Sequence, residues 1–330
     1  MVNTQNRRIE NQRSQIKNSP VSIIETINLT KRYGDLTALN NLNMTIEEGD
    51  CFGFIGPNGA GKTTTIKILA TLLRPDWGEA RIAGWSVGRV DARNVRMIIG
   101  YVPDYFGSYE NMVVREYLEF FCAAYQIDGP QRNQVVANVL ELTDLAEKVD
   151  VEVNSLSRGM QQRLSVARVL LHDPKVLLLD EPASGLDPRA RIEMRELLKE
   201  LHRMGKTILI SSHILLELAD LCNKVGIIER GELRFTGTMH DTLERARMGR
   251  VLHVVVQQRP AEAADLIAAL PGVGSAQVQD GRIRVEMSNA SADASAVAAK
   301  LVNGGFGLLG LEEEKVDLET AFMRLTEGKV

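Results

Sequence analysis

Apolar and polar positions in the first part of the chain alternate as in strands and then follow a helical period. Residues 22–29 and 38–46 read as two strands separated by a turn around Gly34. A third apolar run, 51–55, leads directly into a glycine-rich loop, and a helical stretch follows over 62–73. Strand, glycine loop and helix in this order are the context in which a loop can cradle phosphate groups.

The pattern becomes mostly helical over residues 95–171 and returns to strands afterwards. The helices expected in this insert cover 117–124, 131–142 and 158–171. The strands expected next are 176–179, 207–211 and 225–229. A helix over 189–204 separates the first two of these strands, as a βαβ crossover requires. We therefore expect an α/β core that carries a helical insert.

The composition changes after about residue 239 and becomes richer in Ala and Val. A strand, a helix, a hairpin across Asp280 and Gly281, a second helix and a last strand are expected in turn. The two strands and two helices outside this hairpin cover 251–256, 261–270, 292–302 and 308–312. The order βαββαβ fits a small ferredoxin-like α+β domain. The predicted organisation is a disordered tail over 1–20, a main domain over 21–239 and an accessory or regulatory domain over 250–330.

Composition and charge narrow the possible classes of function. The chain of 330 residues has a formal net charge of −4, which argues against a nucleic-acid binder held by a global basic field. No apolar run is long enough to cross a bilayer, so a membrane role must come through a partner. The polar, basic N-terminal tail is not a secretory signal. Three scattered cysteines without metal spacing fit a reducing cytoplasm.

The glycine-rich loop carries the first candidate chemistry. Its glycines let the backbone wrap around phosphate oxygens and point N–H groups at them, and the following helix adds its positive end. Lys62 supplies a charge to the β and γ phosphates, and the Thr63 hydroxyl can ligate Mg²⁺. The candidate phosphate-binding residues are Gly56, Pro57, Asn58, Gly59, Ala60, Gly61, Lys62, Thr63 and Thr64. A nucleotide is the expected ligand.

The second candidate element is the apolar strand 176–179, which ends in two acidic residues. Such a strand delivers carboxylates to the edge of a buried sheet, where ligands of α/β proteins sit. Asp180 is placed to hold Mg²⁺, and Glu181 is the better candidate to activate an attacking water beside the γ phosphate. Between the loop and this strand, Ser157 is expected to cap a helix whose free N–H groups could bind an anion.

Together these segments resemble an ABC-family nucleotide-binding domain over residues 21–237. Residues 156–161 resemble the signature motif of that family, with Arg158 and Met160 in place of the commoner glycine and glutamine. The segment ending in Asp187 resembles its D-loop, and His213 resembles the switch histidine that contacts the γ phosphate. Tyr33 stands where the family places an aromatic side chain against adenine.

The resemblance implies a P-loop NTPase fold of the ABC type, with an antiparallel β subdomain and the helical insert. It implies an ATPase that uses ATP and Mg²⁺, in which Ser157 and Gly159 of one subunit grip the γ phosphate bound by the other. The chain has a single set of motifs, so the partner would be a second copy or another ABC subunit in an ATP-dependent dimer. The resemblance also implies transmembrane permease subunits, a cytoplasmic place on the inner face of the cell membrane, and export as the direction of transport.

One position departs from the pattern of the family. Asp104 follows the strand at 98–102 where the family usually has glutamine. Its carboxylate can offer an oxygen toward Mg²⁺ or its waters, but it adds a negative charge and removes a hydrogen-bond donor. The aromatic residues that follow include candidate contacts to a transmembrane subunit: Tyr105, Phe106, Tyr109 and Tyr117. We expect at least one such contact within 105–109.

Two other functions compete with the transporter hypothesis. A non-transport ABC ATPase acting on DNA or ribosomes is the first alternative, but such relatives carry long coiled-coil insertions or two cassettes, and neither occurs here. A module that holds ATP without hydrolysing it is the second, and the presence of Glu181 and His213 argues against it. GTP is disfavoured as the nucleotide because the segment 223–226 lacks the aspartate with which GTP-binding proteins recognise guanine. The sequence does not identify the cargo.

Overall fold

The protein divides into two compact units, which we describe separately. The larger unit comprises Met1–His213 with Glu217–Thr236, and the smaller unit comprises Ile214–Leu216 with Gly237–Val330. The computed structural model describes residues 22–88, 90–105, 107, 111–242, 251–279, 281–288 and 293–313, without the side chain of Leu216. The tail over 1–20, Phe106, Tyr109 and Asp280 lie outside the described residues.

A six-stranded sheet forms the centre of the larger unit, in the order β10-β9-β3-β8-β7-β6. Its strands are β3 (Cys51–Ile55), β6 (Ile99–Val102), β7 (Val176–Asp180), β8 (Thr207–Ser212), β9 (Lys224–Glu229) and β10 (Glu232–Thr238). The pairs β3–β8, β3–β9, β6–β7 and β7–β8 are parallel. Every residue of β3, β7 and β8 is buried, which explains their nearly continuous apolar sequences. The carboxyl ends of β3, β7 and β8 therefore meet at one edge.

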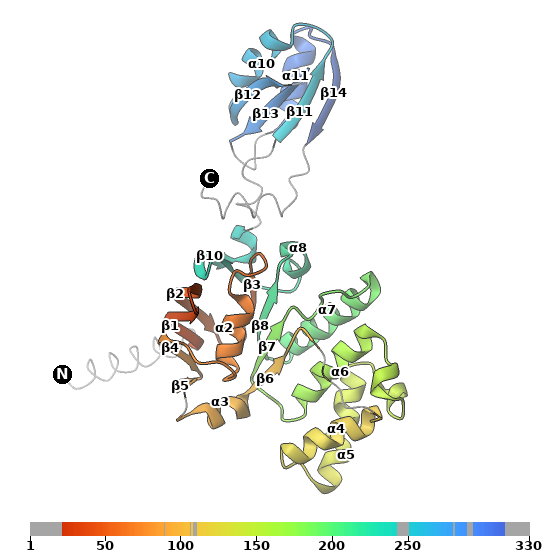
Figure 1. The fold of residues 1–330 in the computed structure, drawn as a ribbon. Helices are drawn as coiled ribbons and strands as arrows, with labels where there is room; N and C mark the ends of the chain where they lie inside the picture. Colours follow the sequence, from red (N-terminus) through yellow and green to blue (C-terminus); the bar gives the residue numbers. More distant parts are fainter. Residues whose placement is uncertain are drawn as a thin grey trace, which may run out of the picture. The chain divides into compact units, whose positions relative to one another are not determined.

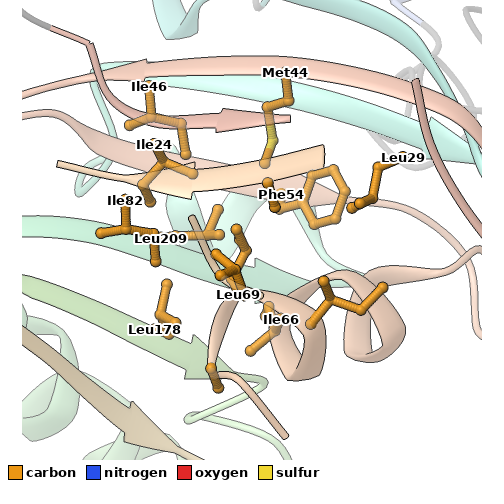
Figure 2. Close-up of a cluster of buried hydrophobic side chains, with 14 of the residues drawn as sticks. Ile24, Leu29, Met44, Ile46, Phe54, Ile66, Leu69, Ile82, Leu178 and Leu209 are labelled. Carbon is orange, nitrogen blue, oxygen red and sulfur yellow. The ribbon is translucent and has the colours of Figure 1, made fainter. Parts of the chain in front are cut away.

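An antiparallel sheet packs on the central sheet through a shared hydrophobic core. It has the order β2-β1-β4-β5 and consists of β1 (Ser22–Tyr33), β2 (Leu36–Glu47), β4 (Trp77–Ile82) and β5 (Trp85–Ser86). Figure 2 shows Ile24 and Ile46 of this sheet beside Phe54 and Leu209 of the central sheet and Ile66 of the first helix. This core holds one face of β3, the strand that precedes the glycine loop, through Phe52 and Phe54.

The larger unit has helices that lie beside its sheets and helices that group together as the insert (Figure 1). They are α2 (Lys62–Leu69), α3 (Ala92–Ile98), α4 (Val114–Ala124), α5 (Gly129–Leu142), α6 (Arg158–Leu170) and α7 (Pro188–Arg203), with single 3₁₀ turns at Ala146–Lys148 and Val153–Ser155. The residues of the short α8 (Leu215–Leu218) are divided between the two units. Two boundaries differ from the prediction. The helix expected over 62–73 ends at Leu69, because Thr71 takes a left-handed φ of 63°. The helical insert begins at α4, since β6 belongs to the central sheet.

The smaller unit is a four-stranded antiparallel sheet with two helices packed on it. Its elements are β11 (Val251–Val256), α10 (Pro260–Ala268), β12 (Val273–Gln279), β13 (Arg282–Met287), α11 (Ala294–Asn303) and β14 (Leu308–Glu313). The strand order β12-β13-β11-β14 follows from the predicted succession βαββαβ. Its apolar residues form a separate core that includes Leu252, Ile283 and Leu301.

Candidate functional site

The loop between β3 and α2 takes its shape from two glycines. A Cβ on Gly56 would lie 2.3 Å from the Ile228 carbonyl oxygen, and one on Gly61 would lie 2.7 Å from the Ala38 carbonyl oxygen. Gly61 also has a φ of 112°, which side chains rarely allow. The Ala60 N–H donates to the Pro57 carbonyl (3.1 Å), which closes the turn. Glycine is therefore required where the loop presses against β2 and β9.

Lys62 is buried at the centre of this loop, with only 5% of its surface exposed. Its ammonium donates to the carbonyl oxygens of Gly56 (2.6 Å) and Pro57 (3.2 Å). It also pairs with Oε1 of Glu181 at 3.3 Å. The loop thus wraps around a cation at the end of the central sheet.

Asp180 ends β7 beside the first turn of α2 and is 2% exposed. Its Oδ1 accepts hydrogen bonds from Ser211 Oγ (2.8 Å) and Thr63 Oγ1 (3.2 Å). Burial raises the pKa of Asp180, the two hydrogen bonds lower it, and the charges of Glu181 and Asp104 raise it further. The negative charge of the buried Asp180 carboxylate is therefore only partly offset by these two hydrogen bonds.

Glu181 follows directly and takes a left-handed φ of 47°. Its backbone N–H donates to Ser211 Oγ at 2.9 Å, and its Oε2 lies 3.0 Å from Nδ1 of His213. With Lys62 on its other oxygen, the carboxylate of Glu181 lies between a cation and an imidazole. A non-glycine residue in this region of φ costs about 1–3 kcal/mol.

These groups border a pocket of about 230 Å³. Its lining residues come from β1, β2, the glycine loop and the end of β7: Tyr33, Leu36, Ala38, Asn58, Gly59, Gly61, Lys62, Thr63, Thr64 and Glu181. The pocket is smaller than the roughly 300–1,000 Å³ of ordinary small-molecule sites. Tyr33 stays 47% exposed at its edge.

Ser157, Gly159 and Asp187 are not among the residues that line the pocket. Ser157 caps α6, where its Oγ accepts from the Met160 N–H (3.3 Å), and Asp187 caps α7, where its Oδ2 accepts from the Ala190 N–H (3.3 Å). A Cβ on Gly159 would lie 2.6 Å from Cβ of Ala190, so the first turns of the two helices touch. This pair of helix starts is an exposed surface feature separate from the pocket.

Asp104 and the aromatic stretch after it are only partly described. Asp104 is exposed just beyond β6, and its charge acts on Asp180 and on Tyr101. Burial, followed by the charges of Asp180 and Asp104, raises the pKa of Tyr101 to about 12. Tyr105 is 83% exposed, whereas Tyr117 is fully buried in the insert. Tyr117 is therefore unsuited to be a surface contact.

The sequence analysis missed Ser211, Leu36 and Ala38 as site residues. Ser211 joins the two acidic residues, since it donates to Asp180 and accepts from the Glu181 N–H. The polar end of the apolar run 207–211 was the available signal. Leu36 and Ala38 line the pocket from β2, and nothing in their local sequence marks them.

Comparisons with known proteins agree with this geometry. Residues 39–184 match the family model for the ABC transporter. The chain is 39% identical to the Nod factor export ATP-binding protein I of Burkholderia lata over 76% of this chain and 82% of that protein. It is 29% identical to the linearmycin resistance ATP-binding protein LnrL of Bacillus subtilis, over 92% of this chain and 98% of that protein.

Solved structures with the same fold are cassettes of transporters. The cbiO1 protein of Clostridium perfringens, part of the transporter complex cbiONQ, has a TM-score of 0.61 and 28% identity, covering 67% of this chain and 90% of that one. The dimeric bacterial ABC transporter cassette MJ0796 has a TM-score of 0.60 and 28% identity, covering 66% and 99%. These comparisons do not favour an ABC ATPase of DNA or ribosomes. The chain belongs to the ABC transporter family and is an ATP-binding subunit of that family.

Proposed function

We propose that this subunit hydrolyses ATP with Glu181 as the general base and that hydrolysis powers export through separate transmembrane subunits. The observation that carries the proposal is the carboxylate of Glu181, held 3.3 Å from the phosphate-loop lysine and 3.0 Å from His213 at the border of the pocket. A general base must lie within hydrogen-bond reach of the water that attacks the γ phosphate. Lys62 marks where that phosphate binds.

Each remaining residue of the pocket has a role that follows from its place. The N–H groups of the glycine loop and the start of α2 face the phosphates, with Lys62 adding a full charge. Tyr33, at the far edge of the pocket, offers its ring to adenine. The imidazole of His213 orients Glu181 and reaches toward the γ phosphate.

The donors around Asp180 fit a magnesium ion. A hydroxyl from Thr63 and a carboxylate from Asp180 converge within 3.2 Å, and both are oxygen ligands of the kind that Mg²⁺ prefers. The raised pKa of Asp180 fits a carboxylate that a cation neutralises. Asp104 stands on the neighbouring strand end as a third oxygen donor, directly or through water. The ion would neutralise charge on the β and γ phosphates of bound ATP.

We infer that a second subunit completes the site. The pocket is small and open, and Ser157, Gly159 and Asp187 do not line it. The free N–H groups at the start of α6 favour an anion, and the γ phosphate bound by a second subunit supplies one. A homodimer, or a pair with another ABC subunit, would then form with ATP and loosen on hydrolysis.

The membrane partner is proposed from the relatives and from the surface of the insert. Relatives are named for Nod factor export and for linearmycin resistance, which favours export as the direction here. No helix among the described residues has the length and apolar character to cross a membrane. Permease subunits would hold the protein at the cytoplasmic face, and exposed Tyr105 is our candidate contact to them.

The first test is the variant Glu181→Gln in the full-length protein. We expect it to bind ATP and to lower kcat by about 10²- to 10⁴-fold, because an amide cannot accept the proton of water. Glu196→Gln is the matched control, because the side chain of Glu196 on α7 is exposed and pairs with Lys199 of the same helix, and this variant should keep wild-type kcat. Hydrolysis by Glu181→Gln at the wild-type rate would rule out Glu181 as the base.

The second test captures the partners. Tagged Glu181→Gln protein is recovered from native membranes in mild detergent with ATP present, and mass spectrometry identifies what accompanies it. A multi-spanning membrane protein in near-equal amount supports the transporter proposal. Ribosomal or DNA-associated companions without any membrane protein would favour the alternative.

A further inference from the structure

Arg158, the first residue of α6, lies with its guanidinium against Gly185. A Cβ on Gly185 would lie 2.4 Å from Nη1, 2.6 Å from Cζ and 2.8 Å from Nη2 of Arg158. Three atoms of one planar group at nearly the same distance indicate that the flat face of the guanidinium occupies the space that a Cβ on Gly185 would need. The side chain of Arg158 makes no hydrogen bond or ion pair with any residue that the structure describes, so packing alone holds the guanidinium there.

Gly185 belongs to the short loop that joins Glu181 to α7. The Ser184 N–H donates to the Glu181 carbonyl at 3.0 Å, and Asp187 caps α7 at the other end. Glu181 and Gly185 both have a positive φ, 47° and 65°. A movement of Gly185 therefore changes a backbone turn that begins at the proposed base itself.

The residue after Arg158 also contacts α7. A Cβ on Gly159 would lie 2.6 Å from Cβ of Ala190, so the first turns of α6 and α7 touch. The side chain of Arg158 thus spans from one helix start to the loop that leads into the other. A glycine at position 158, as in the commoner form of the signature motif, has no atoms to make this contact.

We propose that Arg158 is a positioning residue that couples the start of α6 to Glu181 within one subunit. The inference rests on the proposed function, in which the start of α6 meets the ATP bound by a second subunit. A shift at the start of α6 moves the guanidinium, the guanidinium moves Gly185, and the turn after Glu181 follows. Through this contact, nucleotide bound at one site of the dimer sets the position of the base at the other.

The test combines kinetics with a double-mutant cycle. Arg158→Gly should lower kcat by about 2- to 30-fold, the range for a single coupling residue, with KM within about twofold and a Hill coefficient for ATP that falls toward 1. Gly185→Ala, whose Cβ displaces the guanidinium, should have a similar effect. If both act through one contact, the double variant is no worse than Gly185→Ala alone. Fully additive losses would overturn the proposal.

Two further variants separate packing from charge. Arg158→Lys keeps the cation but has no flat face, so we expect it to behave like Arg158→Gly; wild-type kinetics for Arg158→Lys would overturn the proposal. Arg189→Lys is the matched control, since Arg189 lies in the first turn of α7 and its side chain pairs with Glu193 and not with Gly185.

Hydrogen exchange gives a readout that does not depend on hydrolysis. Arg158→Gly should raise amide exchange in a peptide covering 181–187 of the nucleotide-free protein, and Arg189→Lys should not. Unchanged exchange in Arg158→Gly would overturn the positioning role even if the protein hydrolyses no ATP. Lost hydrolysis in the wild type, with the exchange difference present, would count against the proposed function and leave the contact established.

Discussion

At the scale of single residues, the charge on Asp180 serves the proposed Mg²⁺ site but lowers the stability of the fold. Burial raises its pKa above the ordinary value of 3.8. The charged form is therefore disfavoured by folding, and the contribution of Asp180 to stability is greatest below pH 3.8 and is lost as the pH rises through the higher pKa of the folded state. At neutral pH the buried carboxylate lowers the stability of the nucleotide-free protein.

The raised pKa of Asp180 gives a prediction for the variant Asp180→Asn. We expect its Tm at pH 7 to rise above that of the wild type, and the rise to shrink at acidic pH, while Mg²⁺-dependent hydrolysis falls by at least about 10²-fold. Asp50→Asn is the control, because Asp50 pairs with Lys224 (3.1 Å) and accepts from Asn223 (2.8 Å), so its loss should lower Tm. A lower Tm for Asp180→Asn would contradict the argument.

Asp104 allows a second prediction at this scale. If its carboxylate faces the metal, Asp104→Gln should raise the Mg²⁺ concentration for half-maximal hydrolysis by about tenfold. It should also raise Tm, since the charge of Asp104 is one cause of the raised pKa of Asp180. A titration of activity against Mg²⁺ checks the first effect. An unchanged Mg²⁺ dependence means that the carboxylate has no special role.

At the scale of elements, the contact between α6 and α7 depends on a missing side chain. Gly159→Ala would bring two Cβ atoms to 2.6 Å, so the helix starts must separate at a cost of about 1–3 kcal/mol. We expect a lower denaturation midpoint for Gly159→Ala and a recovery in the double variant Gly159→Ala with Ala190→Gly. Urea unfolding of the full chain measures both. A double variant less stable than Gly159→Ala would show that the strain lies elsewhere.

Elements were predictable where one segment carries its own signal. The buried strands β3, β7 and β8 have continuous apolar runs, and the glycine loop is contiguous in sequence, so both could be predicted. Strand β4 was missed because four of its six residues are exposed, and β5 has only two residues. Strand β6 was recognised only as a short segment inside a helical region. Its place in the sheet depends on pairing with β7, which lies over 70 residues further along the chain.

The same distinction applies to the site. Lys62, Thr63, Asp180 and Glu181 belong to local motifs, whereas Ser211 gains its role only when β8 pairs with β7. The contact between Arg158 and Gly185 joins the start of α6 to the loop before α7, which is distant in sequence, and no local pattern predicts it. Resemblance to the family pointed to His213, and the structure brings it to Glu181.

At the scale of the whole molecule, each of the two units has a hydrophobic core of its own among the described residues, which implies two units of stability. One core joins β1, β2 and β4 to α2 and the central sheet, and the other lies between α10, α11 and the last four strands. The contact units divide at Thr236 and Gly237, near the change of composition at residue 239. The proposed nucleotide site draws only on the larger unit. Ligand binding therefore stabilises one unit directly.

Calorimetry of Glu181→Gln tests this independence, because this variant should bind ATP without consuming it. We expect two transitions, and ATP with Mg²⁺ at 100 times the Kd should stabilise the larger unit by about 2.7 kcal/mol. This corresponds to a rise of roughly 5–10 °C in one transition. A variant that also carries Lys62→Ala should show no rise at the same concentration, since it lacks the phosphate cation. If both transitions move together, or if there is a single transition, the smaller unit unfolds together with the larger one. That result would contradict the independent stability of the two units.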